Sequence, residues 1–117
     1  MAKVLVVDDD MINRKLLNVL LQKQGYDVIE AENGMEGLNI IKNEPIDMVL
    51  LDIIMPVMDG IDLLKLLKQD DAHKNIPVAI LTTDDTRKNE ALNLGAAAVL
   101  IKPIKEPELL EVLSNHL

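Results

Sequence analysis

The feature that most constrains this fold is the run Met48-Val49-Leu50-Leu51, which leads directly into Asp52 and then into a loop containing Pro56 and Gly60. An uninterrupted apolar run bounded by turn signals predicts a strand that is buried on both faces, as in a parallel sheet. Because burying a carboxylate among apolar neighbours is costly, we expect Asp52 at the carboxyl end of this strand. Ligands of open α/β sheets bind at that edge. Asp52 is therefore the first candidate for the chemically active residue, as a nucleophile toward phosphorus.

The rest of the chain alternates between apolar runs and helical patterns. Strands are predicted at Val4–Val7, Val28–Ile29, Met48–Asp52, Val78–Leu81 and Val99–Ile101. Helical patterns run from Ile12 to a stop at Gly25, from Asn33-Gly34 to a stop before Pro45, from about Gly60 to Lys68, from roughly Thr86 to Leu94, and from near Pro107 onward. The last helix is expected to bury Leu109, Leu110, Leu113 and Leu117. This alternation predicts an α/β fold, with a parallel five-stranded sheet covered by helices on both faces and right-handed crossovers.

Composition narrows the classes of function. The 117 residues give room for one hydrophobic core, and we expect a single domain over 1–117. A formal net charge of −8 argues against nucleic-acid binding, which needs clustered Lys and Arg, and favours cations or basic partners. The absence of cysteine fits a reducing compartment. Apolar runs are too short for a signal-peptide core or a bilayer span, so we expect a cytoplasmic protein without membrane contact.

Reactive polar residues end four of the five predicted strands. They are Asp8 (followed by Asp9), Asp52, Thr82 and Lys102. In a parallel sheet all these ends lie at one edge, with neighbouring strands about 4.8 Å apart. If the first and third strands are neighbours, Asp8 or Asp9 can share one ion with Asp52; an intervening strand would make this awkward.

Converging carboxylates raise an electrostatic problem. Two unit charges about 4 Å apart repel each other by ~4 kcal/mol at an effective dielectric constant near 20. Lys102 offsets part of this repulsion. A hard divalent cation offsets more, and Mg²⁺ is commonly held by one or two carboxylates beside a phosphate. The pattern therefore predicts a site for Mg²⁺ and a phosphoryl group, with a carboxylate as nucleophile.

Taken together, these motifs resemble the receiver domain of response regulators in two-component signalling. The matching segments cover essentially the whole chain and are Val6-Val7-Asp8-Asp9, Asp52 with Met55-Pro56-Val57-Met58-Asp59-Gly60, Leu81-Thr82, and Lys102-Pro103. The resemblance implies a flavodoxin-like (βα)5 three-layer sandwich with strand order 2-1-3-4-5.

The resemblance also implies a metal site and an acceptor. Asp52 would accept a phosphoryl group from a histidine kinase or a histidine phosphotransfer protein. Asp9 and Asp52 would ligate Mg²⁺ directly, together with the backbone carbonyl of Ile54, while Asp8 would act largely through water. The domain would catalyse its own phosphorylation and dephosphorylation, rather than turn over a separate substrate.

Switching residues follow from the same resemblance. Thr82 would hydrogen-bond a phosphoryl oxygen, and Lys102 would pair with the phosphoryl charge, with a cis bond between Lys102 and Pro103. The segment after Thr82 and the surface from the fourth helix to the last would then change for a downstream protein target or output domain. Because the chain ends one helix after Lys102, we expect no output domain within it.

Two positions depart from the family pattern. Val99 stands where an aromatic residue often takes part in switching, so the switch must use aliphatic repacking or backbone shifts. Ile54 is apolar where some members are polar; with Asp84 it lies where attacking water would approach, and we expect it to affect the phosphoryl lifetime. The fourth helical segment has few apolar residues, which favours it as the moving part.

Two other functions are consistent with parts of the pattern. Asp8-Asp9-Asp10 contains the D-x-D of haloacid-dehalogenase-type Mg²⁺-dependent phosphatases, with Asp8 as nucleophile, although Asp52 would then have no role. A pseudo-receiver that only binds partners is the third possibility, and the intact acid set argues against it. The acid run could also be simply a strand-end turn and helix cap, the role expected for Asp10.

Overall fold

The computed structural model describes residues 1–55 and 58–117; Pro56 and Val57, part of the predicted loop motif, lie outside the described residues. The described residues form one sheet of five parallel strands, β1 (Lys3–Val7), β2 (Asp27–Ala31), β3 (Met48–Asp52), β4 (Val78–Thr82) and β5 (Ala98–Ile101). Their spatial order is β2-β1-β3-β4-β5, which confirms the predicted order. The first and third strands are therefore neighbours, as a shared ion requires.

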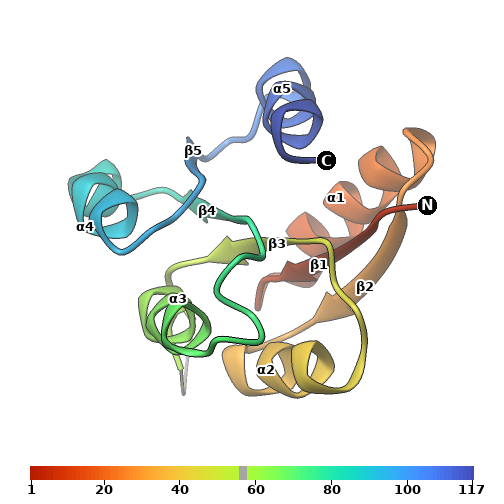
Figure 1. Cartoon of the computed structure of the whole chain (residues 1–117). Coiled ribbons are helices and arrows are strands. Elements are labelled where there is room, and N and C mark those ends of the chain that lie inside the picture. Colours follow the sequence, from red (N-terminus) through yellow and green to blue (C-terminus); the bar gives the residue numbers. More distant parts are fainter. Residues whose placement is uncertain (56–57) are drawn as a thin grey trace.

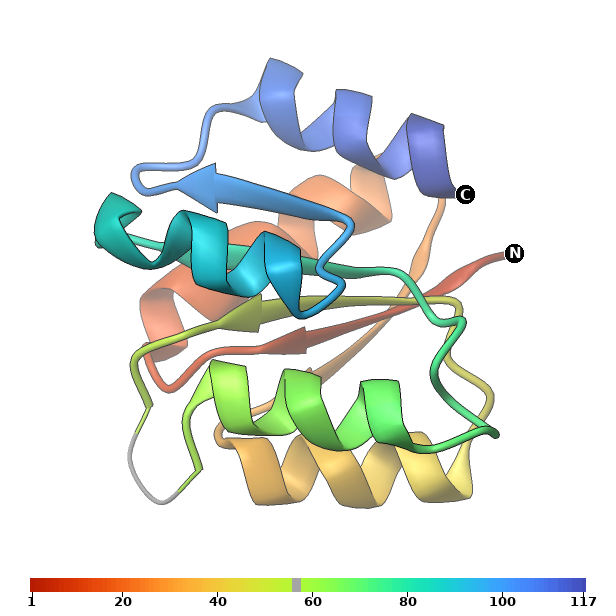
Figure 2. The same cartoon turned by 60° about the vertical axis from the view of Figure 1, so that its left-hand side comes forward.

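Helices cover both faces of this sheet and give three layers (Figures 1 and 2). The helices are α1 (Met11–Lys23), α2 (Gly34–Asn43), α3 (Gly60–Gln69), α4 (Lys88–Asn93) and α5 (Glu106–His116), with a 3-10 turn, η1 (Asp85–Arg87), before α4. Helices α1 and α5 lie on one face, and α2, α3 and α4 lie on the other. None of the helices in the described residues is long and apolar enough to cross a membrane.

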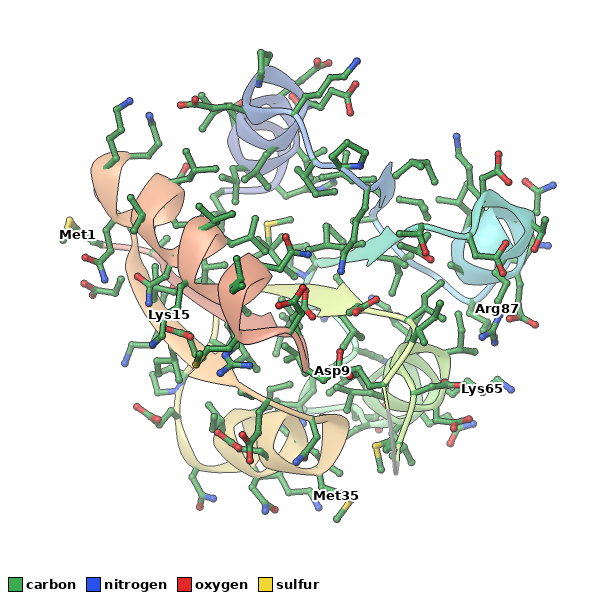
Figure 3. The ribbon with its side chains drawn as sticks, turned by 180° about the vertical axis from the view of Figure 1, so that it is seen from behind. Met1, Asp9, Lys15, Met35, Lys65 and Arg87 are labelled. Carbon is green, nitrogen blue, oxygen red and sulfur yellow. The ribbon has the colours of Figure 1, made fainter. Side chains whose placement is uncertain are left out.

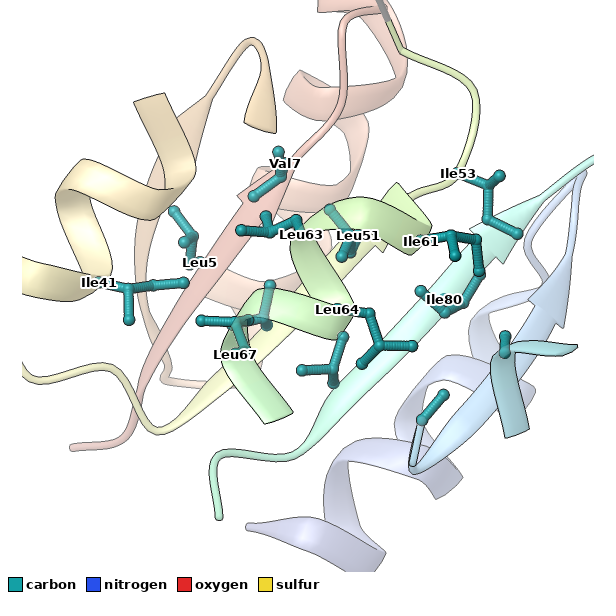
Figure 4. Packing of buried hydrophobic residues seen from close by; sticks show 14 of the residues in the cluster. Leu5, Val7, Ile41, Leu51, Ile53, Ile61, Leu63, Leu64, Leu67 and Ile80 are labelled. Atoms are coloured by element: carbon teal, nitrogen blue, oxygen red, sulfur yellow. The ribbon is translucent and has the colours of Figure 1, made fainter. Parts of the chain in front are cut away.

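Alternate strand residues feed two apolar clusters, one on each face. Figure 4 shows Leu63, Leu64 and Leu67 of α3 lying over strand residues that include Leu51 and Ile80. The opposite cluster packs Leu17 and Leu21 of α1 and Leu109 and Leu113 of α5 against the other side chains of the strands. Because the central strands are buried on both faces, their sequences are continuous apolar runs rather than alternating ones.

Local capping explains where the helices begin and end. Asp10, Asn33 and Asp59 are the N-caps of α1, α2 and α3, and each side chain accepts a hydrogen bond from a backbone N–H of the first turn. Gly25 and Gly95 follow α1 and α4 with φ of 89° and 105°, a conformation that glycine adopts without strain. The predicted cap role of Asp10 is confirmed.

Three details differ from what helical periodicity alone indicates. Leu117 is 43% exposed, so its predicted burial is wrong, because α5 ends at His116 and the helical period no longer places Leu117 on the buried face. Ile12 and Leu16 belong to the periodic pattern of α1 but are 71% and 59% exposed. The fourth helical segment is also divided, with η1 preceding an α4 that ends at Asn93.

Candidate functional site

Three carboxylates meet at the carboxyl edge of the sheet. Val7 pairs with Leu51 in the β1–β3 register, so Asp8 and Asp52 follow at the ends of neighbouring strands. Asp8, Asp9 and Asp52 each offer one carboxylate oxygen, and these atoms all lie within 4.8 Å of one another. Figure 3 shows Asp9 where β1 leads into α1. The predicted convergence of the acids is therefore present in the structure.

These acids differ sharply in exposure. Asp8 is fully buried, Asp52 is 6% exposed, and Asp9 is exposed. Buried carboxylates need hydrogen-bond donors, and Asp8 receives them from the Asp10 backbone N–H at 2.9 Å and the Asn13 side-chain amide at 3.4 Å. Within the described residues, no buried side-chain nitrogen or oxygen lacks a hydrogen-bond partner.

Lys102 brings the balancing positive charge. Its Nζ lies 3.1 Å from Asp8 Oδ2 and 3.3 Å from Asp52 Oδ2, so one ammonium group bridges the two buried acids. Its backbone N–H donates to the Thr82 carbonyl at 2.7 Å, which fixes the start of the side chain at the strand end. The Lys102–Pro103 peptide bond is cis, as predicted. The side chain thus spans the edge of β4 to reach Asp52.

The site retains a net negative charge that the pKa values reflect. Burial raises the pKa of Asp52 from its ordinary 3.8 to about 6, Lys102 works against this rise, and the nearby Asp8 carboxylate adds to it. For Lys102, burial alone would lower the pKa of the ammonium, but the Asp52 and Asp8 carboxylates raise it above its ordinary value. Lys102 is therefore charged at neutral pH. A further cation would reduce the remaining repulsion between the carboxylates.

Close backbone packing holds Asp52 in place. A Cβ at Gly60 would overlap the Asp52 carbonyl oxygen and crowd the backbone of Ile53. The Gly60 N–H donates to the Ile53 carbonyl at 2.9 Å, which ties the start of α3 to the residue that follows β3. The Ile54 N–H donates to Asp52 Oδ1 at 3.2 Å, while the Ile54 side chain is 58% exposed. This packing therefore requires glycine at position 60.

Thr82 ends β4 beside the acids but is fully buried. Its Oγ1 accepts a hydrogen bond from the Asp84 backbone N–H at 2.9 Å. Asp84 in turn caps η1, and its side chain accepts from the Thr86 backbone N–H. The hydroxyl is thus coupled to the turn that leads toward α4.

One charged group near the site was not anticipated from the sequence. Arg14 of α1 donates to the backbone carbonyl of Asp8 and to the carboxylate of Glu30 on β2. Opposite charges at these positions were the only available signal. Residues 14 and 30 become neighbours only once α1 lies over β2, which local patterns do not specify.

The donor set suits a hard divalent cation. Carboxylate and carbonyl oxygens are the ligands that Mg²⁺ prefers, and Asp8, Asp9 and Asp52 place such oxygens together with a surplus of negative charge. The exposed position of Asp9 leaves the group open to solvent on one side. The residues present therefore fit the predicted ion in number, chemistry and access.

This fold and acidic edge define a receiver domain of two-component response regulators. The chain belongs to that family, since the model named Response regulator receiver domain matches residues 4–114. Protein PilH of Pseudomonas aeruginosa is 38% identical over 116 residues, covering 97% of this chain and 96% of PilH. Sporulation initiation phosphotransferase F of Bacillus subtilis is 38% identical over 117 residues, covering 98% of this chain and 93% of the relative.

Solved structures agree with this assignment. The chemotaxis response regulator CheY4 of Vibrio cholerae superposes with a TM-score of 0.92 at 35% identity, covering 100% of this chain and 99% of CheY4. A receiver domain from Francisella superposes with a TM-score of 0.90 at 34% identity, covering 99% of this chain and 97% of that domain. The flavodoxin-like fold predicted from the sequence is confirmed.

Proposed function

We propose that this receiver domain accepts a phosphoryl group on Asp52 from a histidine kinase or a histidine phosphotransfer protein, in a reaction that depends on Mg²⁺. The observation that carries the proposal is the meeting of Asp52 with Asp8, Asp9 and the Lys102 ammonium at one edge of the sheet. A site with surplus negative charge favours a cation, and Mg²⁺ held by one or two carboxylates commonly binds a phosphate as well. A neutral site would have no surplus charge for a cation to balance.

Asp9, Asp52 and the backbone carbonyl of Ile54 would hold the ion, and Asp8 would act largely through water. The burial of Asp8 supports this division, because its oxygens are already hydrogen-bonded by protein groups. When bound, Mg²⁺ would neutralise charge on the carboxylates and the phosphoryl oxygens, so that the like charges can approach. Asp9, which is exposed, keeps the site open to the ion.

Asp52 would act as the nucleophile. With a pKa of about 6, its carboxyl is mostly ionised at neutral pH. One carboxylate oxygen attacks phosphorus, the bond from phosphorus to the donor imidazole nitrogen breaks, and that nitrogen leaves with the electron pair. Lys102, already 3.3 Å from Asp52, would pair with the transferred oxygens. Hydrolysis by water would return Asp52 to its carboxylate.

Thr82 would report the modification to the surface. Its oxygen accepts from Asp84, so its hydrogen remains available for a phosphoryl oxygen, and turning the hydroxyl would disturb the Asp84 turn. Among the described residues of α4, only Ala91 is buried, and one buried methyl group contributes roughly 0.8 kcal/mol. Reorganisation of 83–95 is therefore cheap, and the α4–β5–α5 face would bind the downstream protein.

The phosphoryl donor needs a surface that borders the acids, and the start of α1 supplies one. Met11, Ile12, Leu16 and Val19 are 59–71% exposed and line a shallow hollow of about 280 Å³. Pro103 and Ile104 continue this apolar surface beside Leu16. An apolar helix face on the donor would cover it and bring a phosphohistidine toward Asp52.

Asp8 is a poor candidate for the nucleophile of a dehalogenase-type phosphatase. It is fully buried and its Oδ2 is engaged by Lys102, whereas a nucleophile must reach the substrate. Membership of the receiver family supports Asp52 as the acceptor, whereas the phosphatase interpretation leaves Asp52 without a role.

Site-mapped mass spectrometry after treatment with acetyl phosphate tests the proposal. We expect a phosphoryl adduct on the peptide that contains Asp52, formed with Mg²⁺ and absent with a chelator. Asp52→Asn should remove it, whereas Asp71→Asn, which alters a side chain that is 96% exposed, should not. An adduct on Asp8, or none that depends on Mg²⁺, would refute the assignment.

A further inference from the structure

We propose that Arg14, held by Glu30, is a positioning residue that sets the β1–α1 turn for cation binding. The inference rests on the proposed function, because it concerns the same metal site. Neither residue belongs to the acids and lysine of that site. Arg14 nevertheless contacts the carbonyl of the peptide bond between Asp8 and Asp9.

One guanidinium group makes both connections. Arg14 Nη1 donates to the backbone carbonyl of Asp8 at 2.7 Å, and Arg14 Nε donates to Glu30 Oε1 at 2.9 Å. The Arg14 and Glu30 side chains are 12% and 16% exposed, so this is not a loose surface pair. Because guanidinium is planar and rigid, fixing one side of it by Glu30 fixes the direction of the other.

Glu30 is itself held firmly. Its Oε2 accepts from Lys15 Nζ at 2.9 Å and from the Asn18 side-chain amide at 2.6 Å. Burial alone would raise the pKa of Glu30, but hydrogen bonds from Lys15, Asn18 and Arg14 lower it below its ordinary value. Glu30 also lies opposite Val6 in the β1–β2 register, two residues before Asp8. It is thus a charged anchor on the neighbouring strand.

The consequence for Asp9 follows from peptide geometry. The Asp8 carbonyl lies in the same rigid plane as the Asp9 nitrogen and Cα, so the atom that holds this carbonyl also orients Asp9. The Asp8 N–H is already tied to the Ala31 carbonyl at 3.1 Å. Within the described residues, no hydrogen bond or ion pair is made by the Asp9 side chain. Arg14 therefore supplies the contact that orients Asp9, whose side chain has no such contact of its own among the described residues.

The affinity for Mg²⁺ distinguishes a positioning role of Arg14 from a simple effect of its positive charge. Removing the positive charge of Arg14 would strengthen Mg²⁺ binding if Arg14 acted only by electrostatic repulsion. Loss of positioning has the opposite sign, because groups that orient metal ligands typically change affinity by about 10–100-fold. Lys15→Gln is the matched control, since it removes a positive charge beside the same Glu30, from a side chain that is 62% exposed, while the contacts of Arg14 and Asn18 with Glu30 remain.

The experiment is calorimetric titration of Mg²⁺ into the wild type, Arg14→Gln, Arg14→Lys and Lys15→Gln at one pH, with unfolding midpoints measured in chelator. We expect the dissociation constant to rise about tenfold in Arg14→Gln, to rise also in Arg14→Lys, and to stay within twofold in Lys15→Gln. Lysine keeps the charge but cannot form the two-sided bridge.

A double-variant cycle completes the test. Glu30→Gln should weaken Mg²⁺ binding in the wild type and add little in the Arg14→Gln background, because Glu30 acts through Arg14. If the Arg14 variants lose stability but bind Mg²⁺ as the wild type does, or bind it more tightly, the inference is wrong. If the wild type binds no Mg²⁺, the proposed function itself fails. Should Arg14→Gln not fold, Arg14→Lys and Glu30→Gln decide the question.

Discussion

At the scale of single residues, the chemistry depends on a carboxyl group held where its charge is unfavourable. Asp52 is 6% exposed and lies beside the Asp8 carboxylate, and the Lys102 ammonium bridges both. One ammonium cannot neutralise three acids. The protein therefore keeps an electrostatic cost that a bound cation would relieve, and this cost should be measurable in the absence of metal.

We predict that metal-free protein becomes less stable as the pH rises through the pKa of Asp52. The folded protein holds this proton up to about pH 6, whereas the unfolded chain loses it near 3.8. The contribution of Asp52 to the free energy of unfolding is thus largest below pH 3.8 and falls by about 3 kcal/mol by the time the folded group has ionised.

Asp52→Asn removes this ionisation and should be more stable than the wild type at pH 7 by about 1–3 kcal/mol. Denaturant unfolding in chelator between pH 4 and pH 7.5 measures the difference, with the exposed Asp71→Asn as control. Identical pH slopes for the wild type and Asp52→Asn would show that the carboxyl is not strained.

We predict that Ile54 sets how long the phosphoryl group persists. Its side chain is 58% exposed, two residues after the acceptor, and offers attacking water no hydrogen bond. Ile54→Asn adds an amide that can hold water, so dephosphorylation should accelerate by a few-fold. Ile54→Val is the control that keeps the position apolar. Equal hydrolysis rates for Ile54→Asn and the wild type would remove the idea.

At the scale of elements, the start of α3 and the β4–α4 segment differ in how closely they are packed. Gly60, the first residue of α3, makes close backbone contacts with the end of β3. The β4–α4 segment leads into a six-residue helix whose buried set, within the described residues, is Ala91 alone. The backbone contacts of Gly60 should hold Asp52 rigidly, and the β4–α4 segment should respond to changes at Asp52.

Gly60→Ala should damage the site from the backbone side. The added methyl group would overlap the Asp52 carbonyl, and such overpacking typically costs about 1–3 kcal/mol. We expect slower phosphorylation of Asp52 by acetyl phosphate in addition to lower stability. Gly25→Ala is the control: its φ of 89° strains an alanine at that position, but within the described residues only the Met1 sulfur lies near the added Cβ, at 4.0 Å. Loss of stability without loss of phosphorylation in Gly60→Ala would contradict the account.

Hydrogen exchange should locate the switch. A phosphoryl mimic on Asp52 should change amide protection across 83–100, because Thr82 is hydrogen-bonded to the Asp84 turn and α4 buries little area. Protection in β1, which lies in the centre of the apolar core, should stay constant. Unchanged exchange from 83 to 100 would rule out this segment as the moving part.

At the scale of the whole molecule, strand order decides whether these residues can cooperate. Asp8, Asp52 and Lys102 could be predicted to converge, because each ends an apolar run and parallel strands end at one edge. The complete burial of Asp8 could not, since it depends on the Asp10, Asn13 and Lys102 donors that fold around it.

Contacts between helices and strands account for the other features that could not be predicted from the sequence. The Arg14–Glu30 pair depends on how α1 is rotated over β2, and the same rotation leaves Ile12 and Leu16 exposed while Leu17 and Leu21 are buried. Helical period alone identifies the apolar residues of α1 but not which of them the sheet covers. The predicted burial of Leu117 is wrong because this residue follows His116, the last residue of α5, so the helical period no longer places it on the face that the sheet covers.

The central claim is that cations balance the carboxylate cluster, so that Asp52 can accept a phosphoryl group. The most direct test is a structure solved with Mg²⁺ and beryllofluoride, a mimic of the phosphoryl group. We predict beryllium bonded to an Asp52 oxygen, the ion held by Asp9, Asp52 and the Ile54 carbonyl, and Lys102 Nζ moved onto the fluorides. An unmodified Asp52, or an ion bound away from these acids, would contradict the account.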